Sequence, residues 1–256
     1  MYNNYLTPTI TNSSAISIIS DKIKNNIPYA FTRFGDGEIY ILKQKSYPEF
    51  EQLVCKQWGY AYPSEISTFY KDASKIIKSA LLQSDLIGIM DPNCNIVRIN
   101  YSPDIWSLSH NLIKQWGHQP ENFSICDHML SRSIEFGSIQ GMRKLLNGKS
   151  VNIISMHTDL LKQKNLSEKL NADVTFTHHD KTVNLNNRTE FINSFKNIKS
   201  DVVLLGVAIQ KDYGVILRDE YGKIAIDMGA TLDAWAGIIS RPWFNQGNLQ
   251  DHLVIK

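Results

Sequence analysis

Short apolar runs rich in β-branched residues alternate along the chain with longer amphipathic segments, and this alternation limits the folds available to it. The runs predicted to be strands are 29–34, 86–90, 151–156, 173–177, 201–206 and 223–227. The segments predicted to be helices are 14–25, 37–45, 66–82, 104–116, 133–146, 159–169, 187–197 and 231–239. Strands that alternate with helices predict an α/β fold, in which helices flank a mostly parallel sheet. The run DVVLLGVAI is apolar on both of its faces, as expected of a central strand covered on both sides.

One segment interrupts the alternation. Residues 46–64 are rich in aromatic side chains and include two prolines. They are predicted to form an irregular excursion, which is either a lid or part of an acceptor groove, or else a long loop over core aromatics. The sequence shows no repeat and no linker, so residues 1–256 are expected to form a single domain. Ser14 is the expected N-cap of the first helix, and Gly148 the expected C′ residue before the strand at 151.

Composition narrows the classes of partner. A hydrophobic fraction of 43% and a charged fraction of 20% are typical of a soluble globular protein. The net charge of +2 comes with no basic stripe, so a nucleic-acid partner is not expected. The three cysteines, Cys55, Cys94 and Cys126, are far apart, which fits a reducing cytosol and argues against disulfides or a CxxC metal site.

The N-terminal residues MYNNYLTPTITNSS lack the basic and apolar regions of a secretory signal. The apolar run 202–209 is too short to span a bilayer, so no transmembrane segment is expected. The sequence therefore predicts a cytoplasmic protein. It leaves open a peripheral role at the inner membrane face, on a lipid-linked substrate.

Polar and glycine residues follow most of the predicted strands. The groups are Gly35-Asp36-Gly37-Glu38, His157-Thr158-Asp159, His178-His179-Asp180, Gly206 with Lys211, and Asp227-Met228-Gly229. Open parallel α/β sheets bind their ligands at the carboxyl ends of the strands. The sequence therefore predicts a ligand site built from these groups.

The stretch FTRFGDGE carries the sharpest signal. Gly35 and Gly37 allow the backbone to bend and to approach a ligand closely. Between and beside them, Asp36 and Glu38 offer the carboxylate oxygens that Mg²⁺ and Mn²⁺ prefer, and such ions commonly bind phosphate as well. The alternative is a type I′ or II′ turn whose acids are merely solvated. From the spacing alone both interpretations stay open.

Basic residues suited to phosphate lie in the same predicted region. Arg33 leads directly into the acidic turn, where it either contacts phosphate or forms an internal salt bridge to one of the acids. Lys211 is a second candidate for phosphate, and Gly206 a place where a nucleoside can approach a strand end. Arg132 is a weaker candidate. Other phosphate motifs fail, because no GxxxxGK[ST] is present and Tyr40 stands where a GxGxxG motif needs its third glycine.

The predicted acid–base residues are Asp159, His179 and Asp180. Adjacent histidines at a strand end point to opposite sides, so His178 and His179 do not form a zinc site together. The sequence has no GxSxG motif, which a serine hydrolase of that type would need. It also lacks the glycine-rich loop and the HRD-type catalytic loop of a kinase. Asp227 and Asp233 are expected to be metal ligands or helix N-caps, with capping favoured.

FTRFGDGE resembles the RFGDGE signature of the GT-D fold glycosyltransferases, a bacterial family with a DxE motif. The block 201–235 is similar in layout to the closing segment of that family, with Ala230 in place of its histidine. The resemblance implies a Rossmann-like α/β fold, a UDP-sugar donor, and a Mn²⁺ or Mg²⁺ ion held through Asp36 and Glu38.

The expected function is that of a metal-dependent glycosyltransferase in polysaccharide biosynthesis. It would transfer a sugar from a nucleotide-diphosphate donor to a hydroxyl of a glycan, glycoprotein or lipid-linked saccharide. Arg33 and Lys211 would stabilise the diphosphate as its charge develops. Two alternatives stay open: a metal-dependent hydrolase of phosphate esters or nucleotide sugars, and a non-catalytic nucleotide-binding module.

Overall fold

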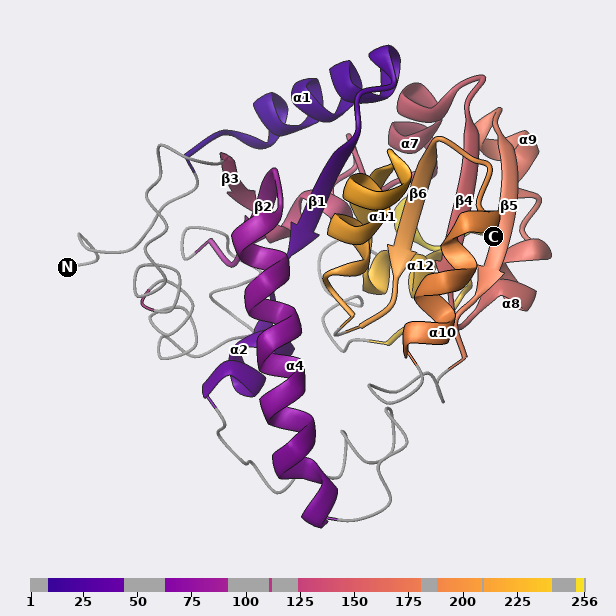
Figure 1. The fold of residues 1–256 in the computed structure, drawn as a ribbon. Coiled ribbons are helices and arrows are strands. Elements are labelled where there is room, and N and C mark those ends of the chain that lie inside the picture. Colours follow the sequence, from indigo (N-terminus) through magenta and orange to yellow (C-terminus); the bar gives the residue numbers. More distant parts are fainter. Residues whose placement is uncertain are drawn as a thin grey trace.

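The computed structural model describes residues 9–43, 63–91, 111, 124–180, 188–208, 210–240 and 252–255 (Figure 1). Two predicted segments lie outside these ranges, namely most of the excursion at 46–64 and all of the helix at 104–116 except residue 111. The side chain of Asp36 also lies outside the description.

Seven strands form one parallel sheet within the described residues. They are β1 (Tyr29–Arg33), β2 (Leu86–Ile89), β3 (Ser124–Asp127), β4 (Ser150–Ser155), β5 (Asp173–His178), β6 (Val202–Gly206) and β7 (Ile224–Asp227). Their order across the sheet is β3-β2-β1-β7-β6-β4-β5, so β2 and β3 lie on one side of β1 and the other strands on the opposite side. Sheets of this kind bind ligands where the strand order changes direction, which here is beside β1.

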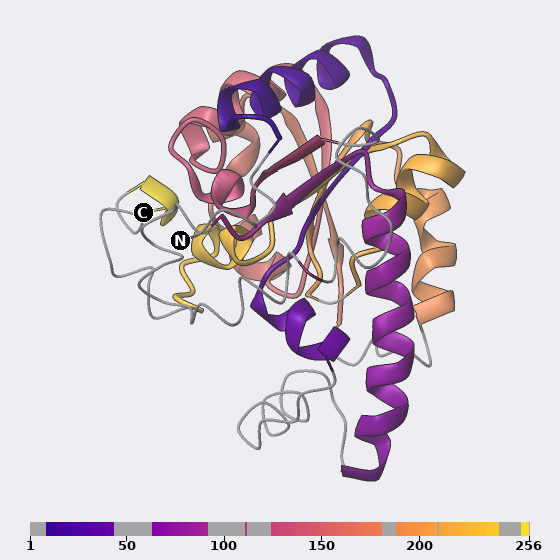
Figure 2. The same cartoon turned by 90° about the vertical axis from the view of Figure 1, so that its left-hand side faces the viewer.

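Helices cover both faces of the sheet, which confirms the predicted α/β class (Figure 2). One face carries α4 (Pro63–Gln83), α10 (Arg188–Asn193), η2 (Ser194–Asn197) and α11 (Tyr213–Tyr221). The other carries α1 (Asn12–Asn25), η1 (His128–Arg132), α7 (Ile139–Leu146), α8 (Thr158–Lys162), α9 (Leu166–Leu170) and α12 (Ala230–Trp235). Helix α2 (Asp36–Lys43) lies beyond the carboxyl end of β1 (Figure 1).

Strand β6 shows how the sequence builds two cores. Val203 and Leu205 pack with η2 and α11 in one apolar cluster. Val202 and Leu204 face the other way, into a cluster shared with α1, α7, α9 and α12. Because successive side chains of a strand point to opposite faces, a strand between two helical layers must be apolar throughout. The prediction that DVVLLG is covered on both sides is confirmed.

Several predicted elements differ from the structure. Strand β3 was not predicted, and the helix expected at 133–146 begins only at Ile139, after η1 and a turn. The helix expected at 159–169 is two short helices, α8 and α9. Ser14 is not an N-cap, because Thr11 caps α1 and accepts a hydrogen bond from the Ser14 N–H. Gly148 has a φ of +70°, as predicted for a C′ residue.

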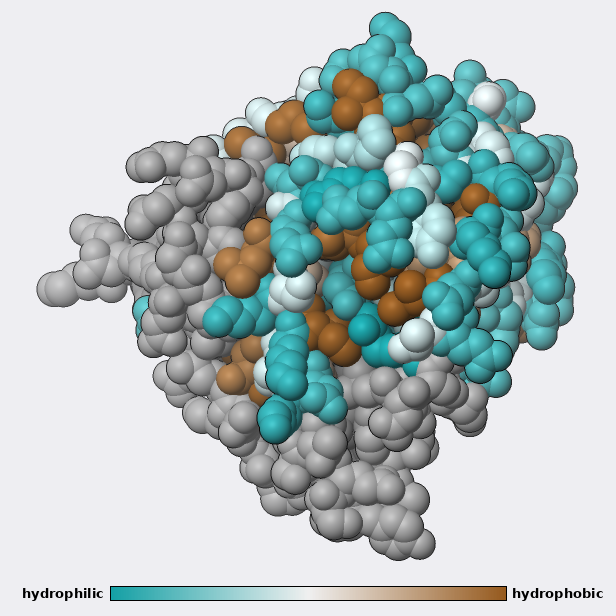
Figure 3. All heavy atoms as spheres, viewed as in Figure 1, coloured by the Kyte–Doolittle hydropathy of each residue, from teal (hydrophilic) through white to brown (hydrophobic). Residues whose placement is uncertain are grey.

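The surface of the described chain is mixed. Figure 3 shows that hydrophilic residues prevail on the face that carries α10 and α11, with hydrophobic residues in smaller groups. Among the described residues, no helix combines the length and hydrophobicity needed to cross a bilayer. The longest, α4, has charged side chains at Lys71, Asp72 and Lys75.

Candidate functional site

Four charged side chains meet at the carboxyl edge of the sheet. Arg33 is the last residue of β1 and Asp227 the last of β7, and these two strands are neighbours. Glu38 lies in the first turn of α2, and Lys211 lies between β6 and α11. All four side chains are largely buried. We call these four residues the charged cluster.

Lys211 lies between the two acids of the cluster. Its Nζ is 2.7 Å from Asp227 Oδ2 and 3.3 Å from Glu38 Oε1. Burial by itself lowers the pKa of Lys211, but the carboxylates of Asp227 and Glu38 outweigh that effect and hold it above its ordinary value. The ammonium is therefore charged at neutral pH, and the two carboxylates converge on a cation.

Glu38 also explains the local shape of the GDGE stretch. Its Oε2 accepts a hydrogen bond of 2.8 Å from the Gly35 N–H, just before the first turn of α2. A glutamate at the third position of a helix that bonds back to the capping residue is half of a capping box. A Cβ on Gly35 would lie 3.3 Å from the same oxygen, so glycine gives the carboxylate room. The predicted alternative of a type I′ or II′ turn is wrong, because Asp36 and Gly37 begin a helix.

Arg33 is held by two residues at and just after the end of β7. Its backbone N–H donates to Asp227 Oδ2 at 3.1 Å, and its side-chain Nη1 donates to the Met228 carbonyl at 3.1 Å. Gly229 makes the second contact possible, since a Cβ there would lie 2.3 Å from Arg33 Nη1. Gly229 also has a φ of +50°, in the region that favours glycine. The Asp-x-Gly segment, Asp227-Met228-Gly229, thus positions Arg33.

Asp227 belongs to the charged cluster, although of its two expected roles the sequence favours the other one. Capping was the favoured expectation for it and for Asp233, and this is wrong, because α12 has Gly229 as its N-cap. Asp233 instead lies in the first turn of α12, with its Oδ1 3.6 Å from His157 Nε2. The available signal for Asp227 was the acid at the end of a strand, directly before Met228-Gly229.

The predicted acid–base residues lie apart from the charged cluster in their contacts. Asp159 is exposed on α8, with its Oδ1 3.3 Å from Lys162 Nζ. Asp180 is exposed just after β5. His179 is buried, packed edge-on against Phe191 and Tyr213. Their roles in proton transfer stay predictions.

Three other predicted positions have structural surroundings of their own. A Cβ on Gly206 would lie 3.0 Å from Leu232 Cδ1, so close packing of α12 already favours glycine there. Gly37 faces open space, with nothing within 4 Å of a built Cβ among the described atoms. Arg132 is buried, with its Nη1 2.9 Å from Met129 Sδ. Contact of these residues with a nucleotide stays a prediction.

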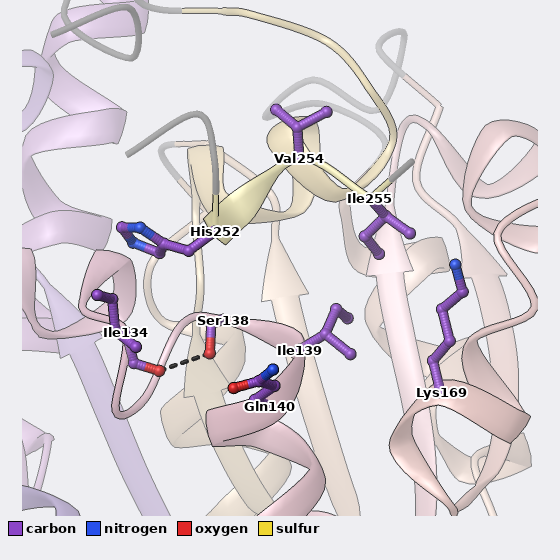
Figure 4. A pocket seen from close by; sticks show the side chains of 8 residues that line it. All are labelled: Ile134, Ser138, Ile139, Gln140, Lys169, His252, Val254 and Ile255. Atoms are coloured by element: carbon purple, nitrogen blue, oxygen red, sulfur yellow. Dashed lines mark hydrogen bonds between the residues drawn. The ribbon is translucent and has the colours of Figure 1, made fainter. Parts of the chain in front are cut away.

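A pocket of about 350 Å³ opens elsewhere, between the start of α7, α9 and residues 252–255 (Figure 4). Apolar side chains form much of its wall, among them Ile134, Ile139 and Ile255. Lys169 and His252 lie on opposite sides of it. The pocket shares no residue with the charged cluster.

The charged cluster fits a hard divalent cation in its chemistry. Within the described part of the chain, no three His, Cys, Asp or Glu side chains form a group that could hold a metal. Glu38 and Asp227, however, direct carboxylate oxygens at one positive centre, and such oxygens are the preferred ligands of Mg²⁺ and Mn²⁺. The remaining positions around such an ion are commonly filled by water and phosphate.

Comparisons with known proteins identify the family of this chain and agree with its fold. The family described as the GT-D fold-like domain matches residues 10–235. The chain belongs to this family. Membership makes it a glycosyltransferase by family, with a sugar donor and an acceptor as substrates. The predicted family and enzyme class are confirmed.

Solved structures show the same fold at low sequence identity. One is a domain of unknown function 1792 described as having a distinct glycosyltransferase fold, with a TM-score of 0.54, 16% identity, and coverage of 90% of this chain and 82% of that one. Another is described as a new glycosyltransferase of the same domain type from Streptococcus sanguinis, with a TM-score of 0.53, 15% identity, and coverage of 91% and 84%. None of the curated proteins matches this chain.

Proposed function

We propose that this glycosyltransferase uses a nucleotide-diphosphate sugar, with UDP-sugar as the expected donor, and a Mn²⁺ or Mg²⁺ ion. The acceptor is a hydroxyl of a glycan, glycoprotein or lipid-linked saccharide. The observation that carries the proposal is the charged cluster, in which Glu38 and Asp227 surround a cation at the carboxyl edge of the sheet. The three cysteines are far apart in the sequence, as expected in a reducing compartment, and this supports a cytoplasmic location. A lipid-linked acceptor would bring the protein to the inner membrane face.

The residues of the cluster would have two roles, metal binding and stabilisation of the diphosphate. Glu38, together with Asp36 from the DxE resemblance, would hold the metal, which when bound offsets the charge of the departing diphosphate. Lys211 supplies a charged ammonium that is within reach of the same place. Asp227 fixes the backbone of Arg33, and the Met228 carbonyl fixes its guanidinium, so the positive charge is positioned before the donor arrives.

Transfer to a hydroxyl also needs a group that takes the acceptor proton if the anomeric centre inverts. Asp159 and Asp180 are exposed and are carboxylates suited to that role. Burial lowers the pKa of His179 to about 4, so its ring is neutral at pH 7. His157 joins these candidates because its Nε2 lies 3.6 Å from Asp233, which can orient the ring.

A thermal-shift panel tests the proposal. UDP, GDP, CDP and ADP are each added with and without Mn²⁺ to the wild type, to Glu38→Gln, and to Glu190→Gln, an exposed acid on α10 that serves as control. A ligand at 100 times its Kd stabilises the fold by about 2.7 kcal/mol. We expect UDP to stabilise the wild type and the control only with metal, and Glu38→Gln to lose the shift.

Product analysis separates the two alternatives. A hydrolase would release free sugar or phosphate from UDP-sugar without an acceptor. A non-catalytic binding module would show the thermal shift but no turnover, and Glu38→Gln would leave its function intact. If no nucleotide shifts the wild type with or without metal, the proposed donor class is wrong.

A further inference from the structure

We propose that Lys211 is the resting occupant of the cation site between Glu38 and Asp227, and that a divalent metal enters this site only together with the donor diphosphate. The lysine then moves from the carboxylates to the phosphate oxygens. This inference rests on the proposed function, since it concerns how the same site takes up its metal and its donor.

The ammonium of Lys211 is held close to both carboxylates. It is 2.7 Å from Asp227 Oδ2 and 3.3 Å from Glu38 Oε1, and the Lys211 side chain is only 9% exposed. Divalent ions contact carboxylate oxygens at about 2.0–2.6 Å, so a metal bound to these oxygens would overlap the ammonium. Metal and lysine therefore compete for one place.

The charge of the cluster also opposes a metal ion that binds without the donor. Glu38 and Asp227 carry two negative charges, and Lys211 and Arg33 carry two positive ones, so these four side chains sum to zero. A divalent ion added alone would leave this group positive, even with the carboxylate of Asp36 counted, and a buried excess of charge is costly away from water. A diphosphate brings at least two negative charges of its own and restores the balance. Metal alone should therefore bind weakly, and metal with nucleotide tightly.

Lys211 can move through its side chain alone. The next residue, Asp212, is fixed by Arg188, whose Nη2 lies 2.7 Å from each of its carboxylate oxygens. The backbone beside Lys211 is thus anchored, and the motion falls to the four-carbon side chain. Such a flexible stem suits an ammonium that exchanges one set of oxygens for another. A diphosphate offers it charge-assisted hydrogen bonds in place of those it gives up.

The test measures Mn²⁺ binding by electron paramagnetic resonance, with and without UDP. In the wild type we expect UDP to tighten Mn²⁺ binding by about 5- to 150-fold, the usual range for coupled sites. In Lys211→Met, Mn²⁺ alone should bind about 10-fold more tightly than in the wild type, and the effect of UDP should shrink. Lys211→Arg keeps the positive charge and should behave like the wild type. Lys162→Met, which removes an exposed lysine on α8, is the control.

A stability measurement shows whether Lys211→Met is folded. Lys211→Met leaves two buried carboxylates without their cation, so its Tm should fall. Mn²⁺ alone should restore that Tm and leave the wild-type Tm unchanged, because the metal takes the place of the ammonium. A variant that stays unfolded with and without Mn²⁺ contradicts the proposal.

The outcomes separate this inference from the proposed function. If the wild type binds UDP with Mn²⁺ but Lys211→Met gains no affinity for Mn²⁺ alone, Lys211 is only a structural partner and the inference is overturned. If the wild type binds no nucleotide under any condition, the proposed donor is wrong. A gain of Mn²⁺ affinity in Lys211→Met would then still support the lysine as occupant of the cation site.

Discussion

At the scale of single residues, His179 links burial to pH. Both of its ring nitrogens lack hydrogen-bond partners in the described structure, and burial lowers its pKa from 6.5 to about 4. Between these values the unfolded chain binds a proton that the folded chain does not, so stability present above pH 6.5 is lost as the pH falls towards 4. We expect the free energy of unfolding to drop by about 3 kcal/mol from this group between pH 7 and pH 4.

Urea unfolding at a series of pH values measures this effect. His179→Phe keeps an aromatic ring against Phe191 and Tyr213 but cannot be protonated, so its stability should vary less with pH over that window. The adjacent His178→Phe leaves His179 buried, which is the main cause of its lowered pKa, and removes only the smaller influence of His178, so it should change the slope less than His179→Phe does. An unchanged slope in His179→Phe would show that other groups cause the acid dependence.

Three of the four residues of the charged cluster could be predicted from the sequence. Arg33, Glu38 and Lys211 were predicted because each is a charged residue near the end of a strand. Asp227, which accepts hydrogen bonds from Arg33 and Lys211, was favoured as a cap, since nothing in the linear sequence says that β7 lies beside β1. The strand order, set by the packing of two helical layers, decides which distant side chains meet.

At the scale of elements, the start of α7 depends on Ser138. Its side chain accepts a hydrogen bond from the Gly141 N–H at 3.0 Å and donates one to the Ile134 carbonyl. We expect Ser138→Ala to lower the free energy of unfolding by about 1–2 kcal/mol, as losses of N-caps do. Gln140→Ala, at an exposed position in the first turn of the same helix, should change it by less than about 0.5 kcal/mol. Equal effects in chemical denaturation would mean that the cap is not what stabilises this helix start.

The same helix explains why element boundaries were harder to predict than the elements. The apolar pattern of 133–146 fits one helix, yet α7 begins at Ile139. A Cβ on Gly137 would lie 1.9 Å from the Ser131 carbonyl oxygen, so η1 folds back onto this turn in a way that only tertiary packing fixes. Strand β3 was missed because SICD is four residues long, partly polar and at the edge of the sheet.

At the scale of the whole molecule, the residues matched by the family end at 235, but the packed structure continues beyond them. Residues 252–255 lie against the layer of α7 and α9, where Lys164 Nζ donates to the Ile255 carbonyl at 2.9 Å. Leu253 and Ile255 are buried, and Val254 between them is half-buried. This alternation indicates that the segment contributes to the apolar core of that layer.

Leu253→Ala tests whether this segment stabilises the whole domain. Because Leu253 is 0% exposed, its truncation should lower the free energy of unfolding by about 2–5 kcal/mol. Val254→Ala, its half-buried neighbour, is the matched control and should cost less than about 1 kcal/mol. Urea unfolding followed by circular dichroism measures both. If Leu253→Ala costs no more than its neighbour, residues 252–255 rest on the domain without stabilising it. A large cost with a single transition means that one cooperative unit includes both the sheet and this distant segment.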